Sequence, residues 1–101
     1  HVNDVAEAHI KCIRFLKKNK KNYYAFNIGV GRGISILELV NQFEKSTGIS
    51  ILYKFGKRRK GDVAELWASC KKSNKYLNWM AKYNLEEMIL SAWNREKNGN
   101  I

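Results

Sequence analysis

The chain has 101 residues and carries 19 Lys and Arg against 9 Asp and Glu, a formal net charge of +10. Its hydrophobic fraction is 45% and its charged fraction is 28%, which is typical of a folded domain and excludes a disordered or fibrous chain. The length suits one small domain. No apolar run approaches the ~20 residues that cross a bilayer, so we expect no membrane partner.

The lysine excess has two interpretations. Lysine and arginine release counterions from phosphates, so a nucleic-acid binder is one of them. We favour the other, a lysine-rich surface without functional meaning, because the lysines are scattered from Lys11 to Lys97. The two cysteines, Cys12 and Cys70, form no C-x-x-C pair and have no zinc-ligand spacing with the histidines. Free cysteines fit a reducing compartment, so the sequence predicts a cytoplasmic protein without a metal.

The first predicted element is a helix that begins at Asp4. Asp4 would cap this helix together with Glu7, three residues later. The apolar stripe of the helix consists of Val5, Ala8, Cys12, Ile13 and Leu16. We expect this stripe to be exposed where the rest of a longer protein would cover it, and the isolated chain to be marginally stable.

The middle of the chain has the pattern of a βαβ unit. Residues 23–28 and 49–55 are rich in β-favouring residues and are predicted strands. Between them lies a helix that Ser35 caps and that Gly48 ends in the left-handed conformation. Because a crossover helix joins them, the two strands should be parallel. The predicted fold class is therefore α/β, a small βαβ unit with flanking helices.

Two further helices are predicted near the end of the chain. The first would span Cys70–Leu77, with Ser69 as its cap and Asn78 in the left-handed end position. The last begins at Asn84, and the side chains of Asn84 and Glu87 would cap it reciprocally.

Two motifs resemble dehydrogenase signatures but do not fit them. The glycine-rich turn at residues 29–33 follows a predicted strand, yet the dinucleotide fingerprint needs a glycine where Ile34 stands. Tyr53 and Lys57 have the spacing of a dehydrogenase Tyr–Lys pair, which works on a helix, where residues four apart are neighbours. On a strand the two side chains would lie about 13 Å apart. Neither motif predicts a dehydrogenase site. The glycine-rich turn ends at a predicted helix N-terminus, so a phosphate-bearing or base-bearing ligand there remains open.

The basic loop at residues 57–62 has the chemistry of a nucleotide-binding turn. The guanidinium of an arginine such as Arg59 can donate two hydrogen bonds to a diphosphate. Asp62 follows a flexible glycine, and its carboxylate can accept hydrogen bonds from ribose hydroxyls. From this chemistry alone, a solvated basic loop remains the favoured interpretation.

A series of motifs, in order along the chain, resembles one enzyme family. The series is Val2-x-Asp4-Val5-Ala6-x-Ala8-His9, Phe26-Asn27-Ile28-Gly29-x-Gly31-x-Gly33-x-Ser35, Arg58-Arg59-x-Gly61-Asp62-Val63-Ala64, Leu77-Asn78-Trp79 and Leu85-Glu86-Glu87-Met88. Together they resemble the C-terminal third of the UDP-glucose 4-epimerases, which are extended short-chain dehydrogenase/reductases with an NAD(P)-binding Rossmann-type fold. The resemblance covers essentially the whole chain.

The resemblance implies that residues 1–101 are the C-terminal UDP-sugar-binding portion of such an isomerase. The enzymes interconvert UDP-glucose and UDP-galactose by NAD-mediated oxidation and reduction at C4. By the resemblance, the NAD-binding domain and the catalytic Ser or Thr and Tyr-x-x-x-Lys would all precede His1. The chain alone is therefore expected to be inactive, with no catalytic residue and no NAD-binding residue of its own.

The resemblance also implies a role for four residues in substrate binding. Arg59 matches the arginine on the diphosphate, and Asp62 matches the carboxylate on the uridine ribose. Ile36 matches an apolar position near the uridine. Leu66 matches a position on the sugar side whose bulk influences N-acetylated substrates. The expected partner is a UDP-sugar, and the resemblance leaves a homodimer open for the full-length enzyme.

Two alternatives remain open. Another UDP-sugar epimerase or decarboxylase of the same family would share the nucleotide-binding loop. A small basic nucleic-acid-binding module is disfavoured, because the aromatic residues do not interleave with the basic run as stacking platforms would. We therefore expect no nucleic-acid partner.

Overall fold

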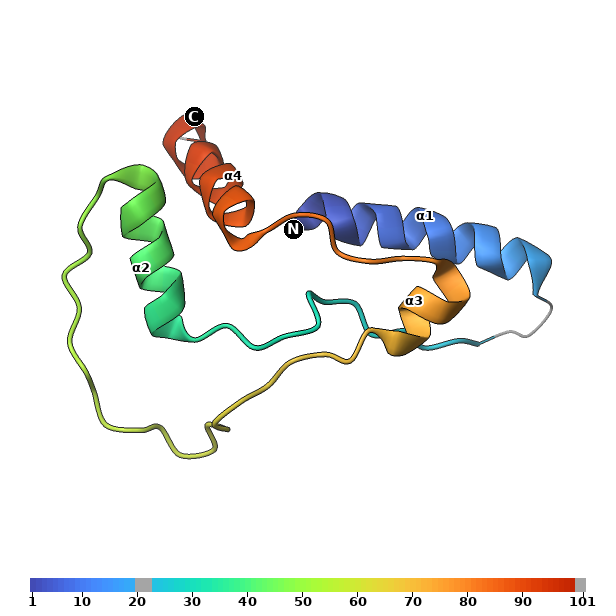
Figure 1. Ribbon diagram of the computed structural model, residues 1–101, viewed down its shortest axis with the longest axis horizontal. Helices are drawn as coiled ribbons and strands as arrows, with labels where there is room; N and C mark the ends of the chain where they lie inside the picture. Colours follow the sequence, from blue (N-terminus) through green and yellow to red (C-terminus); the bar gives the residue numbers. More distant parts are fainter. Residues whose placement is uncertain (20–22, 100–101) are drawn as a thin grey trace. The chain divides into compact units, whose positions relative to one another are not determined.

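The computed structural model describes residues 1–19 and 23–99, and its regular elements there are four helices. They are α1 (Val2–Lys18), α2 (Ile36–Thr47), α3 (Lys71–Leu77) and α4 (Leu85–Asn98) (Figure 1). The chain divides into two compact units. Unit 1 comprises His1–Arg32 and Trp67–Tyr83, and unit 2 comprises Gly33–Leu66 and Asn84–Ile101.

Unit 1 has its core where α1 packs against α3 and the segment that follows α3. Ala8, Leu77 and Trp79 are buried there. Trp79 is only 1% exposed, and its indole N–H donates to the carbonyl oxygen of Asp4 at 2.9 Å. Half-buried side chains surround this core, namely Cys12, Phe15, Phe26, Ile28, Cys70 and Ala81.

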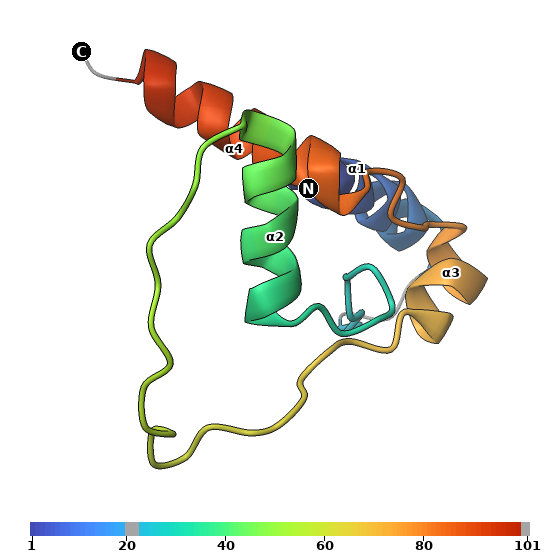
Figure 2. The same ribbon diagram turned by 60° about the vertical axis from the view of Figure 1, so that its left-hand side comes forward.

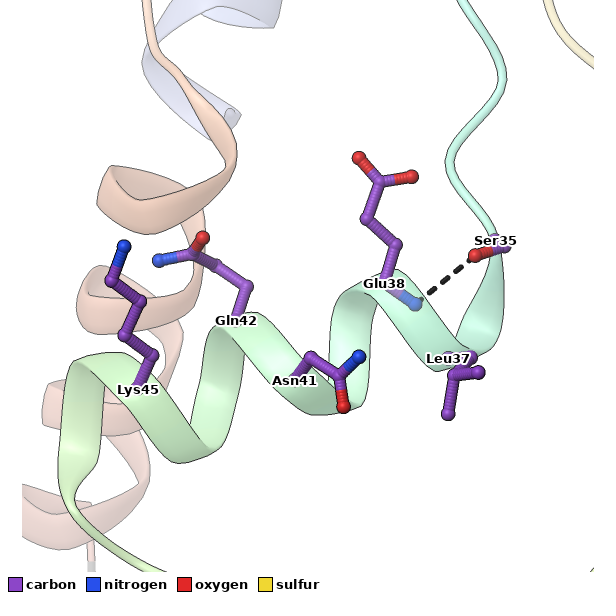
Figure 3. Close-up of a pocket in the computed structure, with 6 residues that line it drawn as sticks. All are labelled: Ser35, Leu37, Glu38, Asn41, Gln42 and Lys45. Carbon is purple, nitrogen blue, oxygen red and sulfur yellow. Dashed lines mark hydrogen bonds between the residues drawn. The ribbon is translucent and has the colours of Figure 1, made fainter.

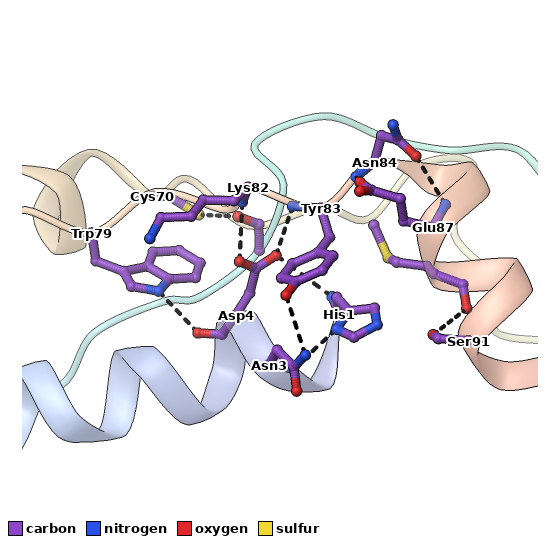
Figure 4. A network of polar contacts seen from close by, with 12 residues as sticks. His1, Asn3, Asp4, Cys70, Trp79, Lys82, Tyr83, Asn84, Glu87 and Ser91 are labelled. Atoms are coloured by element: carbon purple, nitrogen blue, oxygen red, sulfur yellow. Dashed lines mark hydrogen bonds and ion pairs between the residues drawn. The ribbon is translucent and has the colours of Figure 1, made fainter. Parts of the chain in front are cut away.

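The prediction that Asp4 caps α1 is wrong. The helix begins at Val2, and its cap is His1, whose Nδ1 accepts a hydrogen bond from the backbone N–H of Asn3. Asp4 is 2% exposed, and its carboxylate accepts the backbone N–H groups of Lys82 at 3.0 Å and Tyr83 at 3.2 Å (Figure 4). A carboxylate inside the first helical turn is free to serve tertiary donors, and here it holds the residues before α4.

The segment at residues 25–29 accepts hydrogen bonds from three side chains, two in α3 and one from the residue that precedes it. Lys72 donates to the carbonyl of Ala25 at 2.7 Å, and the buried Ser73 hydroxyl donates to that of Asn27 at 2.9 Å. The Cys70 thiol donates to the carbonyl of Gly29 at 3.2 Å. Carbonyls of alternate residues therefore accept hydrogen bonds from one side, as they would along one edge of a strand.

Neither predicted strand is present in the described part of the chain. Residues 23–28 and 49–55 form no ladder, and they belong to different units. A strand is defined by hydrogen bonds to a neighbouring strand, which these residues do not supply to each other. The predicted βαβ unit is therefore not confirmed, and only its helix is observed.

Unit 2 is built on the packing of α2 against α4, which lie side by side in Figure 2. The rings of Phe43 and Trp93 meet edge to face with centroids 5.4 Å apart, and Ile89 is buried. The segment after α2 is tied back by the N–H of Ile51, which donates to the Glu44 carboxylate at 2.7 Å.

The caps of α2 and α4 are confirmed. The Ser35 hydroxyl accepts the N–H of Glu38 at 3.0 Å, and Gly48 ends α2 with φ +72°. Asn84 and Glu87 form the reciprocal capping box of α4, with bonds of 2.9 and 2.8 Å (Figure 4).

The predictions for α3 are confirmed at one end only. Asn78 takes the left-handed position after it with φ +48°. Ser69 does not cap α3; Cys70 is the N-cap residue and makes no side-chain capping bond.

The apolar stripe of α1 is exposed in part. Val5, Ile13 and Leu16 are 43%, 56% and 47% exposed. Ala8 and Cys12 pack instead into the core of unit 1. The expectation of an uncovered face is therefore confirmed for the three larger side chains.

Asn84→Ala is expected to lower the stability of unit 2 by about 1 kcal/mol, because it removes the side-chain oxygen that accepts the backbone N–H of Glu87 and caps the helix. Amide hydrogen exchange in the first turn of α4 measures the effect. Asn94→Ala, an exposed change within the same helix, is the control and should not speed exchange in that turn. Equal exchange in the two variants would show that the box does not stabilise α4.

Candidate functional site

The loop at residues 57–62 forms a tight turn in unit 2. Gly61 has φ +91°, a conformation that glycine adopts without strain, and the N–H of Asp62 donates to the carbonyl of Arg59 at 3.3 Å. Arg59 Nε then reaches Asp62 Oδ2 at 3.0 Å. Arg58 Nη2 lies 3.5 Å from the carbonyl oxygen of Asp62. The turn thus places a guanidinium and a carboxylate side by side.

The Arg59–Asp62 pair is accessible to a ligand. The side chain of Arg59 is 85% exposed and that of Asp62 is 41% exposed. Exposed ion pairs contribute about 0–1 kcal/mol, so a stronger anion can displace the carboxylate from the guanidinium. In the described residues Lys57 and Lys60 form no ion pair, and the turn keeps a net positive charge.

The N-terminus of α2 lies in the same unit. Ile36 is the first residue of the helix and is 76% exposed, directly after the capping Ser35. Figure 3 shows this cap together with side chains along one face of α2, where Asn41, Gln42 and Lys45 line a shallow hollow of about 390 Å³. That hollow is formed by one helix and holds none of the four residues expected to bind substrate.

Leu66 lines a second hollow, of about 380 Å³, in unit 2. The hollow lies between the residues before α2 and the end of the long loop, and its lining residues are Gly33, Ile34, Ser35, Glu38, Ala64, Glu65 and Leu66. Leu66 is 88% exposed, so its side chain is available to a ligand.

All four residues expected to bind substrate therefore belong to unit 2. The structure brings Arg59 into contact with Asp62, and it places Leu66 in a hollow beside the start of α2. Ile36 is the first residue of α2 but does not line the hollow. Sequence reasoning missed Glu65, which lines the hollow next to Leu66; being one of several loop charges, it carried no distinguishing signal.

Two groups with shifted pKa values, Glu7 and Lys82, lie outside this site, in unit 1. The Glu7 carboxylate contacts Lys82 Nζ at 2.8 Å and Lys11 Nζ at 3.4 Å. The hydrogen bond from Lys82 lowers the pKa of Glu7 below its usual 4.5, and the same bond raises the pKa of Lys82 above its usual 10.5. This pair joins α1 to the residues before α4.

Glu7 should make unit 1 sensitive to acid. Because the pKa of Glu7 is lower in the folded chain, its contribution is present at neutral pH and is lost as the pH falls through the folded value. The Lys82 contribution is lost only as the pH rises through its raised pKa. Urea unfolding at neutral and acidic pH should show a smaller acid loss in Glu7→Gln. Glu86→Gln, at an exposed position of α4, is the control and should keep the acid loss of the unsubstituted chain. If Glu7→Gln lost as much stability in acid as the unsubstituted chain, the role of Glu7 would be refuted.

The described residues offer no metal site and no membrane span. No group of three or more His, Cys, Asp or Glu side chains gathers among them in a way that could hold a metal ion. No helix among them is long and apolar enough to cross a membrane.

No protein-family profile matches the chain. Individual relatives do. The bifunctional UDP-glucose 4-epimerase and UDP-xylose 4-epimerase 1 of Pisum sativum is 46% identical over 99 residues, which is 97% of this chain and 28% of that protein. The UDP-glucose 4-epimerase of Erwinia amylovora is 40% identical over 94 residues, or 93% of this chain and 28% of that protein.

Solved structures agree with these relatives. A UDP-glucose 4-epimerase from Stenotrophomonas maltophila, with bound NAD and formylated UDP-arabinopyranose, matches with a TM-score of 0.91 and 33% identity over 98% of this chain and 29% of that one. A UDP-glucose 4-epimerase from Bifidobacterium longum, in complex with NAD+ and UDP, matches with a TM-score of 0.86 and 36% identity over 99% and 30%.

The comparisons confirm the resemblance. In sequence and in fold the chain is related to the UDP-glucose 4-epimerases, and it spans less than a third of their length. The part that it matches is their C-terminal part.

Proposed function

We propose that the chain is the UDP-sugar-binding part of an epimerase that interconverts UDP-glucose and UDP-galactose. The observation that carries this proposal is the turn in which Arg59 and Asp62 meet at 3.0 Å, in a chain related to enzymes of that name. The cluster combines a fork-shaped cation with a carboxylate, which are the groups that a diphosphate and a ribose diol need.

In this proposal Arg59 and Asp62 exchange partners when substrate binds. Without ligand each satisfies the other. The diphosphate oxygens then replace the carboxylate on the Arg59 guanidinium, and the ribose hydroxyls donate to the Asp62 carboxylate. Because the pair is exposed, the cost of breaking it is small.

Ile36 and Leu66 would shape the two ends of the substrate site. The exposed side chain of Ile36 offers an apolar surface for the uracil ring. Leu66 faces the hollow beside α2 and would limit the size of the sugar.

NAD would be held by a part of the enzyme outside this chain. The chain's own glycine-rich turn does not fit the cofactor, because Ile34 stands where the dinucleotide fingerprint requires a glycine. Held there, the cofactor would supply reversible hydride transfer at C4 of the sugar. The residues of this chain would position the nucleotide and supply no acid or base to that step.

We further propose that residues 23–28 and 49–55 become strands in the complete enzyme. The carbonyls of Ala25, Asn27 and Gly29 already face one way, toward α3. Leu52 and Phe55 are 101% and 86% exposed in the second segment, which is unusual for apolar side chains unless further protein covers them.

A wider sugar range is the second candidate. The Pisum sativum relative is named for UDP-xylose as well as UDP-glucose, and the Stenotrophomonas maltophila structure holds a modified UDP-arabinopyranose. The proposed nucleotide contacts would serve any UDP-sugar, including the substrate of a related epimerase or decarboxylase. Competition between UDP-galactose, UDP-xylose and UDP-glucuronate would separate these functions.

A chimaera tests the proposal directly. The chain replaces the matching segment of the Pisum sativum enzyme, and conversion of UDP-galactose to UDP-glucose is measured. We expect epimerase activity well above that of the same enzyme lacking the segment. A folded chimaera that binds NAD but neither binds UDP nor turns over UDP-galactose would contradict the proposal.

A further inference from the structure

Unit 1 contains an aromatic hollow of about 530 Å³ that the proposed function does not use. The rings that line it are those of Phe15, Tyr23, Tyr24, Phe26 and Tyr76. Phe15 lies at the centre of the cluster, with ring centroids 4.9 Å from Tyr24 and 5.6 Å from Phe26. Tyr23 is 82% exposed and Tyr76 is 52% exposed, so both side chains are accessible to solvent.

The charge excess of the chain lies almost entirely in the same unit. Unit 1 contains eleven Lys and Arg and only two acidic residues, whereas unit 2 contains eight Lys and Arg and seven acidic residues. The two acidic residues are already engaged: Asp4 is buried, and Glu7 contacts Lys11 and Lys82. Among the described residues, Lys17, Lys18, Lys72 and Lys75 of unit 1 form no ion pair with an acidic side chain.

Lysines and aromatic rings meet at this hollow. Lys72 lies over the ring of Phe26 at 5.1 Å, and Lys75 lies over that of Tyr76 at 5.3 Å. The last turn of α1, which supplies Phe15 to the hollow, also carries exposed Lys17 and Lys18. In the described residues neither of these two lysines forms an ion pair.

We propose that this face of unit 1, formed by the aromatic hollow and its lysines, binds single-stranded nucleic acid. Bases stack on the open rings of Tyr23 and Tyr76, and the lysines neutralise the phosphates between them. Stacking platforms combined with unpaired cations are what non-specific single-strand binding requires. The aromatic residues that do not interleave with the loop at 57–62 in sequence are here brought together with other lysines by the fold.

The salt dependence of binding tests the role of the lysines. The 101-residue chain is titrated into a fluorescein-labelled oligouridylate, and anisotropy gives the affinity at increasing KCl. Removing three lysines in Lys17→Gln/Lys18→Gln/Lys75→Gln should reduce the slope of log affinity against log salt by about 2. The charge-matched control in unit 2 is Lys45→Gln/Lys54→Gln/Lys97→Gln, which should leave most of the slope intact.

Tyr23→Ala tests the role of stacking. We expect at least about fivefold weaker binding, with unchanged circular dichroism because the ring is exposed. Tyr53→Ala, an exposed tyrosine of unit 2, is the control and should change the affinity by less than that. Equal losses from both lysine sets, no loss in Tyr23→Ala, or displacement of the oligonucleotide by phosphatidylserine vesicles would each overturn the proposal. The UDP-sugar site is unaffected by any of these results, because it shares no residue with this face.

Discussion

Arg59→Lys in the chimaera is expected to lower kcat/KM for UDP-galactose by about 10- to 100-fold, mostly through a raised KM. Lysine keeps the positive charge but loses the planar fork that can donate two hydrogen bonds to a diphosphate. Hydrogen bonds to charged groups contribute about 1.5–3 kcal/mol, which sets the size of the effect. Steady-state kinetics and titration with UDP measure it.

Arg95→Lys is the matched control, since it makes the same exchange at an exposed position of α4, in the same unit. It should leave kcat/KM within about twofold of the parent chimaera, as expected for surface substitutions. Unchanged binding of UDP in Arg59→Lys would remove Arg59 from the diphosphate site, even if the chimaera is an active epimerase.

Trp79→Ala is expected to destabilise unit 1 by about 3–5 kcal/mol, a large fraction of the roughly 5–15 kcal/mol that stabilises an ordinary small domain. The substitution leaves a cavity at the most buried large side chain and removes the donor to the Asp4 carbonyl. Trp79→Phe keeps most of the volume and loses the indole N–H, so its cost should be about 1–2 kcal/mol. Urea unfolding followed by far-ultraviolet circular dichroism measures both.

Trp67→Phe provides the control for this series. Trp67 belongs to the same unit but is 53% exposed, so its replacement should change the stability by less than about 0.5 kcal/mol. If Trp79→Ala were no more damaging than Trp67→Phe, the core assigned to unit 1 would be incorrect.

Helix ends were predictable from the sequence where the signal is local. The Ser35 cap, the Asn84–Glu87 box and the left-handed Gly48 and Asn78 each depend on groups within four residues. A side chain finds such backbone partners whatever the rest of the fold does, so the pattern is sufficient.

Asp4 and the strands were not predictable in the same way. The N–H groups that donate to the Asp4 carboxylate lie 78 and 79 residues further along the chain, so no local pattern predicts them. Residues 23–28 have the composition of a strand, but in the described chain their carbonyls bond to side chains near α3. Local preference cannot supply the neighbouring strand that a sheet requires.

The candidate site was recoverable from the sequence only through resemblance. An arginine and an aspartate three residues apart are compatible with a nucleotide-binding turn, but their chemistry alone favours a solvated basic loop. The structure adds that Gly61 turns the chain so that Arg59 contacts Asp62. It also adds the hollow at Leu66, whose lining residues come from segments about thirty residues apart in the sequence.

An NMR titration of the isotope-labelled chain with UDP shows whether the turn at residues 57–62 binds the nucleotide. We expect the Arg59 Nε–H and the amides of Gly61 and Asp62 to shift on adding UDP, because the diphosphate displaces the Asp62 carboxylate from Arg59. Uridine alone should shift the amides of Ile36 and Asp62 and leave the Arg59 Nε–H in place. If UDP at millimolar concentration shifts none of the resonances of residues 58–62, the turn is not a UDP-binding site and the proposed function is wrong.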